Sequence, residues 1–395
     1  MSGLPLFERL DAQVSLNETE QMLLDSVKAL ARDLIAPNAM RYDKAGEFPE
    51  ENIRGINALG LNAMFIPEAY GGAQLSFSAY LACVREIARA CASTGIIWAT
   101  NFHAIKPLIA YGNEEQKQRL LPRIANGGLA SLAITEPHAG SDATAMTTRF
   151  TPDGDDIIVD GGKCFITNGD RADLLLLFGR WSEIDDPRRA ISVLIFERGT
   201  PGFTILGIEE KMGHKASTTA TISFDGCRVP RANLIRAPGD GLDILFGSLN
   251  RSRPSVAAHA LGIAHAAFER AVAYVNRRRQ SGRWVIEKQG IQFLLAELAT
   301  ELVLVESWLW RVAALAESGD ENFGIESSML KMKATDVAMR ITEEAVQLLG
   351  GNGYCRDYEV ERYMRDAKIT QIWEGTNQIH KQIIGRSFVE KQRGR

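Results

Sequence analysis

The sequence has few of the features that mark several large classes of protein. Its 395 residues contain only five cysteines, and none forms a CxxC pair or a zinc-finger spacing, so we expect reduced thiols rather than a zinc site. The most apolar short run, Leu174 to Phe178, is far shorter than a membrane span. The 45 basic residues are balanced by 49 acidic ones, which leaves no basic surplus for nucleic acid. We therefore expect no nucleic-acid partner and no membrane insertion.

Motifs for several common chemistries are missing as well. The chain contains no GxGxxG or GxxxxGK[ST] nucleotide loop, no HExxH and no GxSxG nucleophile elbow. The polar first eighteen residues have no basic stretch followed by an apolar one, so we expect a cytoplasmic protein without a secretory signal. The six histidines form no obvious ligand set, and we expect no metal: they are His103, His138, His214, His259, His265 and His380.

The chain is too long for one hydrophobic core, and its periodicity divides it into three regions. Residues 1–128 have helical spacing. A capping box at Asn17 and Glu20 opens a helix that Pro37 follows, and a short helix after Asn113 is expected to end before Pro122. Another helix is predicted over residues 76–91.

Residues 129–237 have the alternation of β-strands. Residues 157–159 and 163–166 flank Asp160-Gly-Gly162, which predicts a β-hairpin. Further strands are predicted over 174–178 and 191–196, and around the alternating Ala220, Ile222 and Phe224. Short strands separated by turns favour a small barrel or sandwich.

Residues 238–395 are helical again. Helices are predicted over 254–280, 286–317, 325–349 and 378–391, which together favour a four-helix bundle. The helix over 286–317 carries more apolar residues than one stripe needs, so we expect burial on several sides, including a subunit contact.

Three polar, glycine-bearing segments could hold chemistry: residues 134–142, 165–169 and 371–378. In the third, Thr376 or Asn377 can cap the final helix, and Gly375 allows close approach of a ligand. Glu374 then lies beside an indole, where partial burial would suit a general base. Its residue type fits equally well an acidic group that favours a helix N-terminus, so both interpretations stay open at this point.

Taken together and in order, these and other segments resemble the acyl-CoA dehydrogenase family over nearly the whole chain. Each match is modest alone, but seven in the right order and spacing are specific. They are Pro67–Gly72, Ile134–Asp142, Phe165–Asn168, Lys211–Gly213, Gln347–Tyr354, Met364–Lys368 and Ile372–Gln378.

The resemblance implies an N-terminal helical domain, a middle β-barrel-like domain and a C-terminal four-helix bundle in a homotetramer. It implies FAD as cofactor, an acyl-CoA substrate and an electron-transfer flavoprotein as electron acceptor. Glu374 matches the family's base, which removes the α-proton of the thioester while a β-hydride passes to flavin N5, giving 2,3-enoyl-CoA. Alternatives on the same scaffold are a monooxygenase, a nitroalkane oxidase, a non-oxidative elimination and a non-catalytic scaffold.

The resemblance also transfers ligand roles residue by residue. Substrate contacts are implied for Ser141, Asn250, Arg253, Glu374 and Gly375. Contacts to the flavin half of FAD are implied for Leu132, Ile134, Thr135, Gly140, Ser141, Phe165, Thr167, Thr376 and Gln378, and contacts to its ADP half, partly across a subunit contact, for Arg278, Gln280, Gln289, Gln347, Gly350 and Gly351.

The chain departs from the family pattern at several positions. Ser252 stands where some relatives carry their base, which leaves Glu374 without a competitor. Phe165 replaces a common Trp, Ser281 a common Phe, and Asn250 a common acidic residue. Trp98 is interpreted either as a core residue or as a group that narrows the acyl pocket.

Overall fold

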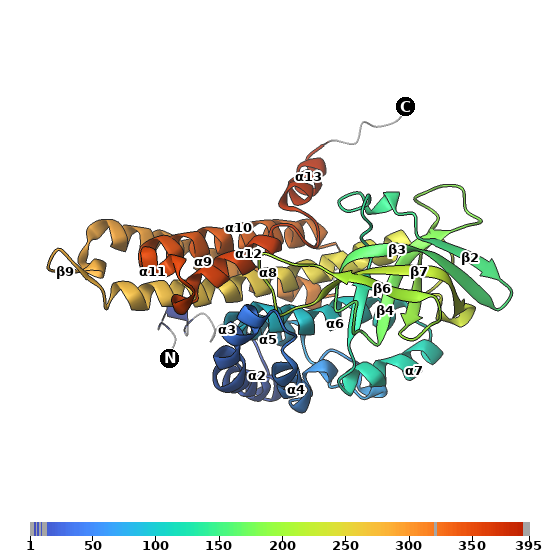
Figure 1. The fold of residues 1–395 in the computed structure, drawn as a ribbon, viewed down its shortest axis with the longest axis horizontal. Coiled ribbons are helices and arrows are strands. Elements are labelled where there is room, and N and C mark those ends of the chain that lie inside the picture. The colour runs from blue at the N-terminus through green and yellow to red at the C-terminus, as the bar shows by residue number, and fades with distance from the viewer. Residues whose placement is uncertain (1–3, 5, 8, 10–13, 320–321, 390–395) are drawn as a thin grey trace.

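The computed structural model describes residues 4, 6–7, 9, 14–319 and 322–389. Figure 1 shows a long bundle of helices with a smaller helical layer beneath it and a β-domain at one end. This arrangement confirms the predicted order of a helical, a strand-rich and a second helical region.

The N-terminal region is built from helices that follow one another closely along the chain. The predicted caps at Asn17 and Asn113 form as complete capping boxes, and Ser76 caps the helix predicted over residues 76–91. The helices are α2 (Glu18–Leu30), α3 (Ala36–Ala45), α4 (Glu50–Ala58), α5 (Phe77–Ala90), α6 (Ala92–Tyr111) and α7 (Glu114–Ala125).

Two prolines do not end helices as the sequence predicted. A π-helical turn over Ala31–Ile35 joins α2 to α3, so that Pro37 falls in the first turn of α3, where a missing N–H costs little. Pro122 lies inside α7, and the expectation that the helix stops before it was wrong. The buried side chains of Leu120, Leu121 and Ile124 hold this helix against the core and offset the lost hydrogen bond.

The middle region forms one mixed sheet whose strands are ordered β1-β4-β2-β3-β7-β6, with β5 paired to β4. The predicted alternation at Ala220, Ile222 and Phe224 is confirmed, since all three are buried. The strands are β1 (Ala130–Ala133), β2 (Arg149–Asp153), β3 (Asp156–Thr167), β4 (Leu174–Trp181), β5 (Ile191–Glu197), β6 (Phe203–Ile208) and β7 (Thr219–Pro230).

The predicted hairpin at Asp160-Gly-Gly162 was wrong, because residues 156–167 form a single strand, β3. The glycines mark a β-bulge instead, where the register with β7 shifts between Val159 and Gly161. Gly161 has φ +138°, and a Cβ there would lie 2.8 Å from the Cα of Thr148, so glycine is required by both backbone and space.

The C-terminal region is a bundle that starts earlier than predicted. Helix α8 begins at Gly241 and passes through Pro254, and a small β-hairpin, β8 (Arg279–Gln280) and β9 (Arg283–Trp284), follows its end. The sequence missed α12, which packs against α8 and α10. The helices are α8 (Gly241–Val275), α9 (Gln289–Glu317), α10 (Gly324–Leu349), α11 (Gly351–Tyr354), α12 (Val360–Thr370) and α13 (Asn377–Ser387).

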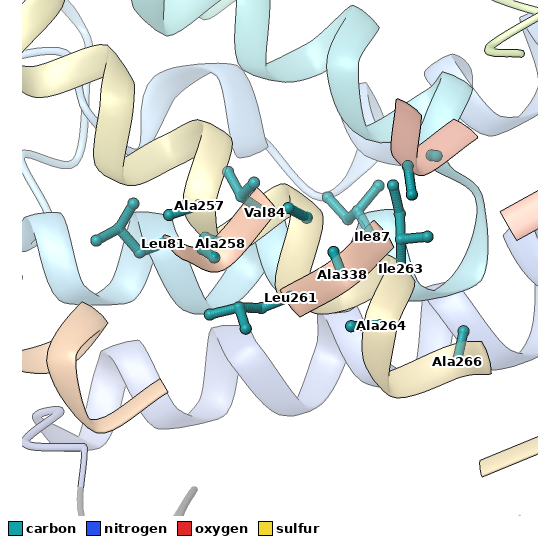
Figure 2. Packing of buried hydrophobic residues seen from close by; sticks show 14 of the residues in the cluster. Leu81, Val84, Ile87, Ala257, Ala258, Leu261, Ile263, Ala264, Ala266 and Ala338 are labelled. Carbon is teal, nitrogen blue, oxygen red and sulfur yellow. The ribbon is translucent and has the colours of Figure 1, made fainter. Parts of the chain in front are cut away.

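Small side chains let the helices of the core approach closely. Figure 2 shows alanines of α8 in one cluster with Leu81, Val84 and Ile87 of α5 and Ala338 of α10. A Cβ at Gly262 would lie 2.3 Å from the carbonyl oxygen of Arg85, so this position cannot carry a side chain without moving α5 away from α8. The close packing fixes the position of α8, and the C-terminal loop that carries Glu374 is hydrogen-bonded to this helix.

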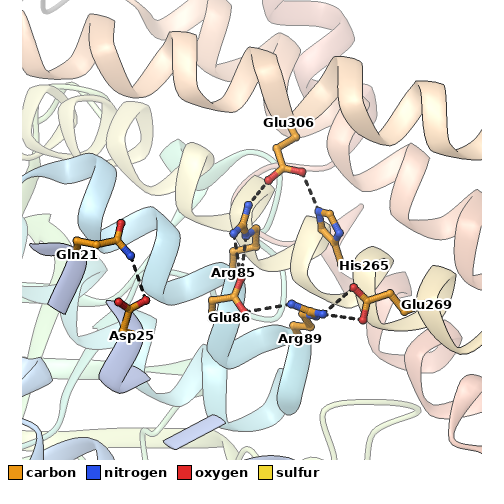
Figure 3. Close-up of polar contacts among 8 residues, drawn as sticks. All are labelled: Gln21, Asp25, Arg85, Glu86, Arg89, His265, Glu269 and Glu306. Carbon is orange, nitrogen blue, oxygen red and sulfur yellow. Dashed lines mark hydrogen bonds and ion pairs between the residues drawn. The ribbon is translucent and has the colours of Figure 1, made fainter. Parts of the chain in front are cut away.

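Buried charges join three of these helices (Figure 3). Glu306 of α9 accepts a hydrogen bond from Arg85 of α5 and lies 2.8 Å from His265 Nε2 of α8. Burial alone would raise the pKa of Glu306, but Arg85 and His265 lower it to about 2. Arg85 also pairs with Glu86, so the arginine and both carboxylates are buried as compensated ions.

Candidate active site around Glu374

The segment between α12 and α13 carries the candidate base on a left-handed backbone. Glu374 has φ +52° and Gly375 has φ +91°, and a non-glycine residue adopts such a φ only at a cost. Thr376 caps α13 by accepting a hydrogen bond from the Ile379 amide, which confirms the predicted cap. The strain at Glu374 is typical of functional positions held by their surroundings.

The carboxylate of Glu374 is half-buried and faces α8. Ser252 Oγ donates a hydrogen bond of 2.6 Å to Glu374 Oε2. The next residue, Arg253, is 6% exposed, and burial lowers its pKa to about 10 while the negative charge of Glu374 opposes that shift. A carboxylate, a hydroxyl and a guanidinium therefore meet where α8 passes the loop.

The two residues implied for the acyl-CoA path are neighbours in space. Arg253 Nη1 donates to Asn250 Oδ1 at 3.2 Å and to Ser328 Oγ of α10 at 3.1 Å. Arg253 Nε is buried without a hydrogen-bond partner among the described residues. A donor in this state is costly in a closed core and is suited to meet a ligand.

Sequence reasoning missed Lys331, which lies directly behind the loop. Lys331 Nζ donates to the carbonyl oxygen of Gly375 at 2.7 Å and to Asn377 Oδ1 at 3.1 Å, and the residue is fully buried. Burial lowers its pKa to about 7, although the charge of Glu374 works against that shift. A lysine among the apolar residues of α10 was the only sequence signal.

Two of the six histidines are neighbours in space, which the sequence alone did not indicate. His214 Nε2 and His259 Nε2 lie 2.9 Å apart, and the ring of Trp373 packs edge-on against both imidazoles. Burial lowers the pKa of His259 to about 3, so this ring is neutral at pH 7. His103 lies within reach of the charge of Glu374, and no group of three or more His, Cys, Asp or Glu in the described ranges could hold a metal ion.

Two of the matched segments meet and support Trp373. The amide of His214 donates to Asp366 Oδ1 at 2.5 Å, and Arg365 Nη1 donates to the carbonyl oxygen of Met212 at 3.1 Å. A Cβ at Gly213 would lie 2.5 Å from the carbonyl oxygen of Arg365. The β-domain therefore contacts α12 directly, and α12 is the helix that leads into the loop carrying the candidate base.

A second β-bulge turns Phe165 outward. The register of β3 against β7 shifts between Lys163 and Ile166, and Phe165 within the shift has φ +59° and is 64% exposed. The amide of Cys164 donates to the carbonyl oxygen of Thr135 at 2.9 Å, which places the strand beside the start of the segment 134–142. An exposed aromatic ring is thus presented next to loop hydroxyls.

The same edge of the β-domain carries most of the other residues implied for the flavin, whereas Thr376 and Gln378 lie at the start of α13. Ser131 Oγ donates to the carbonyl oxygen of Thr167 at 2.5 Å and ties β1 to the end of β3. Glu136 holds the following loop through Thr147, Thr148 and Lys163. Leu132 and Ile134 are half-buried at this edge, whereas Gly140 and Ser141 are exposed in the loop.

The residues implied for the ADP half lie elsewhere. Arg278 lines a cavity of ≈ 390 Å³ with Arg277, Tyr274 and Asn352. The β8–β9 hairpin and α11 occupy the end of the bundle away from the β-domain (Figure 1). All six members of the set are exposed: Arg278, Gln280, Gln289, Gln347, Gly350 and Gly351. Within one chain, the structure does not bring this set together with Glu374.

Comparison with known proteins places this geometry in a family. Residues 17–128 match the acyl-CoA dehydrogenase N-terminal domain, residues 131–227 the middle domain and residues 239–389 the C-terminal domain. The chain belongs to the acyl-CoA dehydrogenase family. Family members use FAD, and the three-part fold seen here is the acyl-CoA dehydrogenase fold.

Similar proteins match along almost their whole length. A probable acyl-CoA dehydrogenase, fadE25, of Mycobacterium leprae is 40% identical and covers 98% of this chain and 99% of its own. Butyryl-CoA dehydrogenase from Megasphaera elsdenii superposes with a TM-score of 0.92 at 34% identity, over 95% of this chain and 99% of that one.

A further solved structure, from work on the electron transferring flavoprotein of Acidaminococcus fermentans, matches with a TM-score of 0.92 at 38% identity, over 95% of this chain and 99% of that one. The chain is therefore an enzyme of the acyl-CoA dehydrogenase class. In the described part of the chain, no helix is long and apolar enough to cross a membrane.

Proposed function

We propose that this enzyme oxidises an acyl-CoA thioester to 2,3-enoyl-CoA with Glu374 as the base. The observation that carries the proposal is the half-buried Glu374 carboxylate, held on a strained loop and hydrogen-bonded to Ser252 Oγ at 2.6 Å. Glu374 takes the α-proton of the thioester as the Cα–H bond breaks. FAD, when bound, accepts the β-hydrogen as a hydride, and the electron pair of the Cα–H bond forms the new double bond.

The surroundings fit this task. Ser252 orients the carboxylate, and the charge of Glu374 is balanced by the buried Arg253 and Lys331. Trp373, which precedes the base in the chain, packs against the uncharged ring of His259. Asn250, Arg253 and Gly375 are proposed to contact the acyl-CoA together with Ser141.

The residues of the β-domain edge fit a flavin. The exposed ring of Phe165 offers a flat surface beside Thr135 and Thr167, and such a ring is costly to leave in water. We assign to the flavin half of FAD the residues Leu132, Ile134, Thr135, Gly140, Ser141, Phe165, Thr167, Thr376 and Gln378.

The position of the second half-site supports an oligomer. Arg278 and its set lie at the other end of the bundle from Glu374 (Figure 1), so one chain does not surround a whole FAD. A second copy can supply the ADP contacts of Arg278, Gln280, Gln289, Gln347, Gly350 and Gly351, and we propose the homotetramer that the family resemblance implies. By similarity to the chain from the Acidaminococcus fermentans study, we propose an electron-transfer flavoprotein as electron acceptor.

The retained Glu374 favours dehydrogenation over the oxygenase, nitroalkane oxidase and elimination alternatives, because relatives with those activities often alter the base. The test is an incubation of FAD-loaded enzyme with a panel of acyl-CoA esters and an artificial electron acceptor. We expect a product two hydrogen atoms lighter than the substrate, by mass spectrometry. An oxygenated or cleaved product would overturn the proposal in favour of the alternatives.

A further inference from the structure

Lys331 is a buried lysine whose Nζ makes no hydrogen bond or ion pair to a carboxylate among the described residues. The residue is fully buried on α10, and its two hydrogen bonds run to the carbonyl oxygen of Gly375 and to the amide oxygen of Asn377. Taking an ammonium out of water costs several kcal/mol even after relaxation of the protein. A hydrophobic residue would fill the same space more cheaply, so the lysine calls for a function at the point that it contacts.

That point is the loop that carries Glu374. The φ angles of +52° at Glu374 and +91° at Gly375 put two successive residues in the left-handed region. A non-glycine residue persists there only when its surroundings over-determine the backbone. Lys331 contacts the carbonyl oxygen of Gly375 at 2.7 Å, one residue after the base.

A second residue of α10, Asp336, also holds this loop. Asp336 Oδ1 accepts from Gln371 Nε2 at 2.7 Å and from Asn377 Nδ2 at 2.8 Å, and these two residues flank the base. The amide of Asn377 also donates to the carbonyl oxygen of Gln371 at 3.0 Å. Lys331 therefore acts at the centre of a loop whose two ends Asp336 already holds.

We propose that Lys331 is a positioning residue that fixes the left-handed backbone at Gly375 and thereby aims the Glu374 carboxylate at the α-hydrogen of the substrate. This inference rests on the proposed role of Glu374 as the base. Lys331 acts on the base only through the backbone, because its hydrogen bonds run to the carbonyl oxygen of Gly375 and to Asn377 Oδ1 and not to the Glu374 carboxylate. Its loss should slow proton transfer while leaving substrate affinity nearly unchanged, since a displacement of about 1 Å costs about 100-fold in rate.

The test compares three variants of the FAD-loaded enzyme. K331M removes the charge and every donor with little change in length. K331Q removes the charge but keeps an N–H donor for the carbonyl oxygen of Gly375. The control T342V removes another buried polar group of α10, whose hydroxyl bonds only to carbonyls of its own helix among the contacts found here. Flavin content and unfolding temperature show which variants are folded.

The measurement is anaerobic stopped-flow bleaching of the flavin by an acyl-CoA that the wild-type enzyme oxidises, which gives a rate constant and a Kd separately. We expect K331M to bleach about 100-fold more slowly with a Kd within about threefold of wild type, K331Q to lie between them, and T342V to match wild type. If K331M does not fold, the rate constants and Kd values of K331Q and T342V are compared instead, and they test the inference in the same way.

A bleaching rate for K331M within threefold of wild type would overturn the inference, and so would an equal loss of rate in T342V. Weaker substrate binding with an unchanged rate constant would also overturn the inference, because that result would assign Lys331 to substrate binding. A wild-type enzyme that no acyl-CoA bleaches contradicts the proposed function itself, which separates the two failures.

Discussion

Ser252 Oγ donates a hydrogen bond of 2.6 Å to Glu374 Oε2, which joins α8 to the loop before α13. Residues 252 and 374 are far apart in the sequence, and α8 is held in place by its close packing against α5. The hydroxyl thus fixes the Glu374 carboxylate, which lies on a strained loop, relative to the rigid helical bundle.

Substitution S252A should leave the base less well oriented towards the substrate. A hydrogen bond to a charged group is worth about 1.5–3 kcal/mol, so the rate of flavin bleaching should fall about tenfold or more. Anaerobic stopped-flow bleaching by an acyl-CoA measures this rate. An unchanged rate would show that the bond does not persist in the enzyme–substrate complex.

Substitution R278M should weaken FAD binding without affecting the folded chain. The exposed Arg278 makes no contribution to the core, whereas a charge-assisted contact to a phosphate is worth about 1.5–3 kcal/mol, or about 10–100-fold in Kd. Titration of apo-enzyme with FAD gives the Kd. R41M removes an exposed arginine of the N-terminal region that pairs with Glu51, and it should leave the Kd unchanged. Equal FAD affinity in R278M and wild type would refute the assignment.

Substitution F165A separates a ligand role from a structural one. Because Phe165 is 64% exposed, its removal should change the free energy of unfolding of the apo-protein by less than about 0.5 kcal/mol. Loss of an aromatic surface for the flavin should weaken FAD binding about 2- to 10-fold, since ring stacking contributes about 0.5–1.5 kcal/mol. Urea unfolding and FAD titration check the two parts. Destabilised apo-protein with normal FAD affinity would contradict the assignment.

The buried network in Figure 3 predicts a loss of stability in acid. The pKa of Glu306 is about 2 in the folded protein, below its ordinary value of 4.5, so its contribution is present above pH 4.5 and is lost as the pH falls towards 2. E306Q should destabilise the protein by about 3–5 kcal/mol near pH 7 and flatten this acid limb, because Arg85 loses a buried partner.

Urea unfolding of E306Q at pH 7 and pH 4 provides the check. The control E297Q, on the same helix, breaks an exposed pair with Arg340 and should cost less than about 1 kcal/mol at both pH values. A parallel pH dependence in E306Q and wild type would show that Glu306 does not titrate as the structure implies.

Local sequence signals predicted most helices and strands, but not the positions where tertiary contacts determine the backbone conformation. Caps at Asn17 and Thr376 and the alternation around Ile222 were sufficient, because each depends on neighbours in sequence. Pro122 and the glycines at 161 and 162 were misinterpreted, since burial keeps a helix intact in one case and pairing with β7 forms a bulge in the other. An aspartate followed by two glycines is compatible with both a hairpin turn and a β-bulge, so the local sequence does not distinguish them.

The candidate site shows the same limit. Glu374 and Phe165 were identified through the family resemblance, but neither positive φ angle is visible in the sequence. Lys331 and the pair of His214 and His259 were missed, because each is brought to the loop from a separate element. A lysine or histidine at an apolar position becomes informative only when its neighbours in space are known.

The most direct test of the central claim is anaerobic bleaching of the flavin by a panel of acyl-CoA esters, in wild type and in E374Q. The account predicts that at least one ester bleaches the wild-type flavin and that E374Q, which keeps FAD and the shape of the side chain, bleaches at least about 1,000-fold more slowly because it has no base. Bleaching of E374Q within about tenfold of wild type would contradict the role of Glu374.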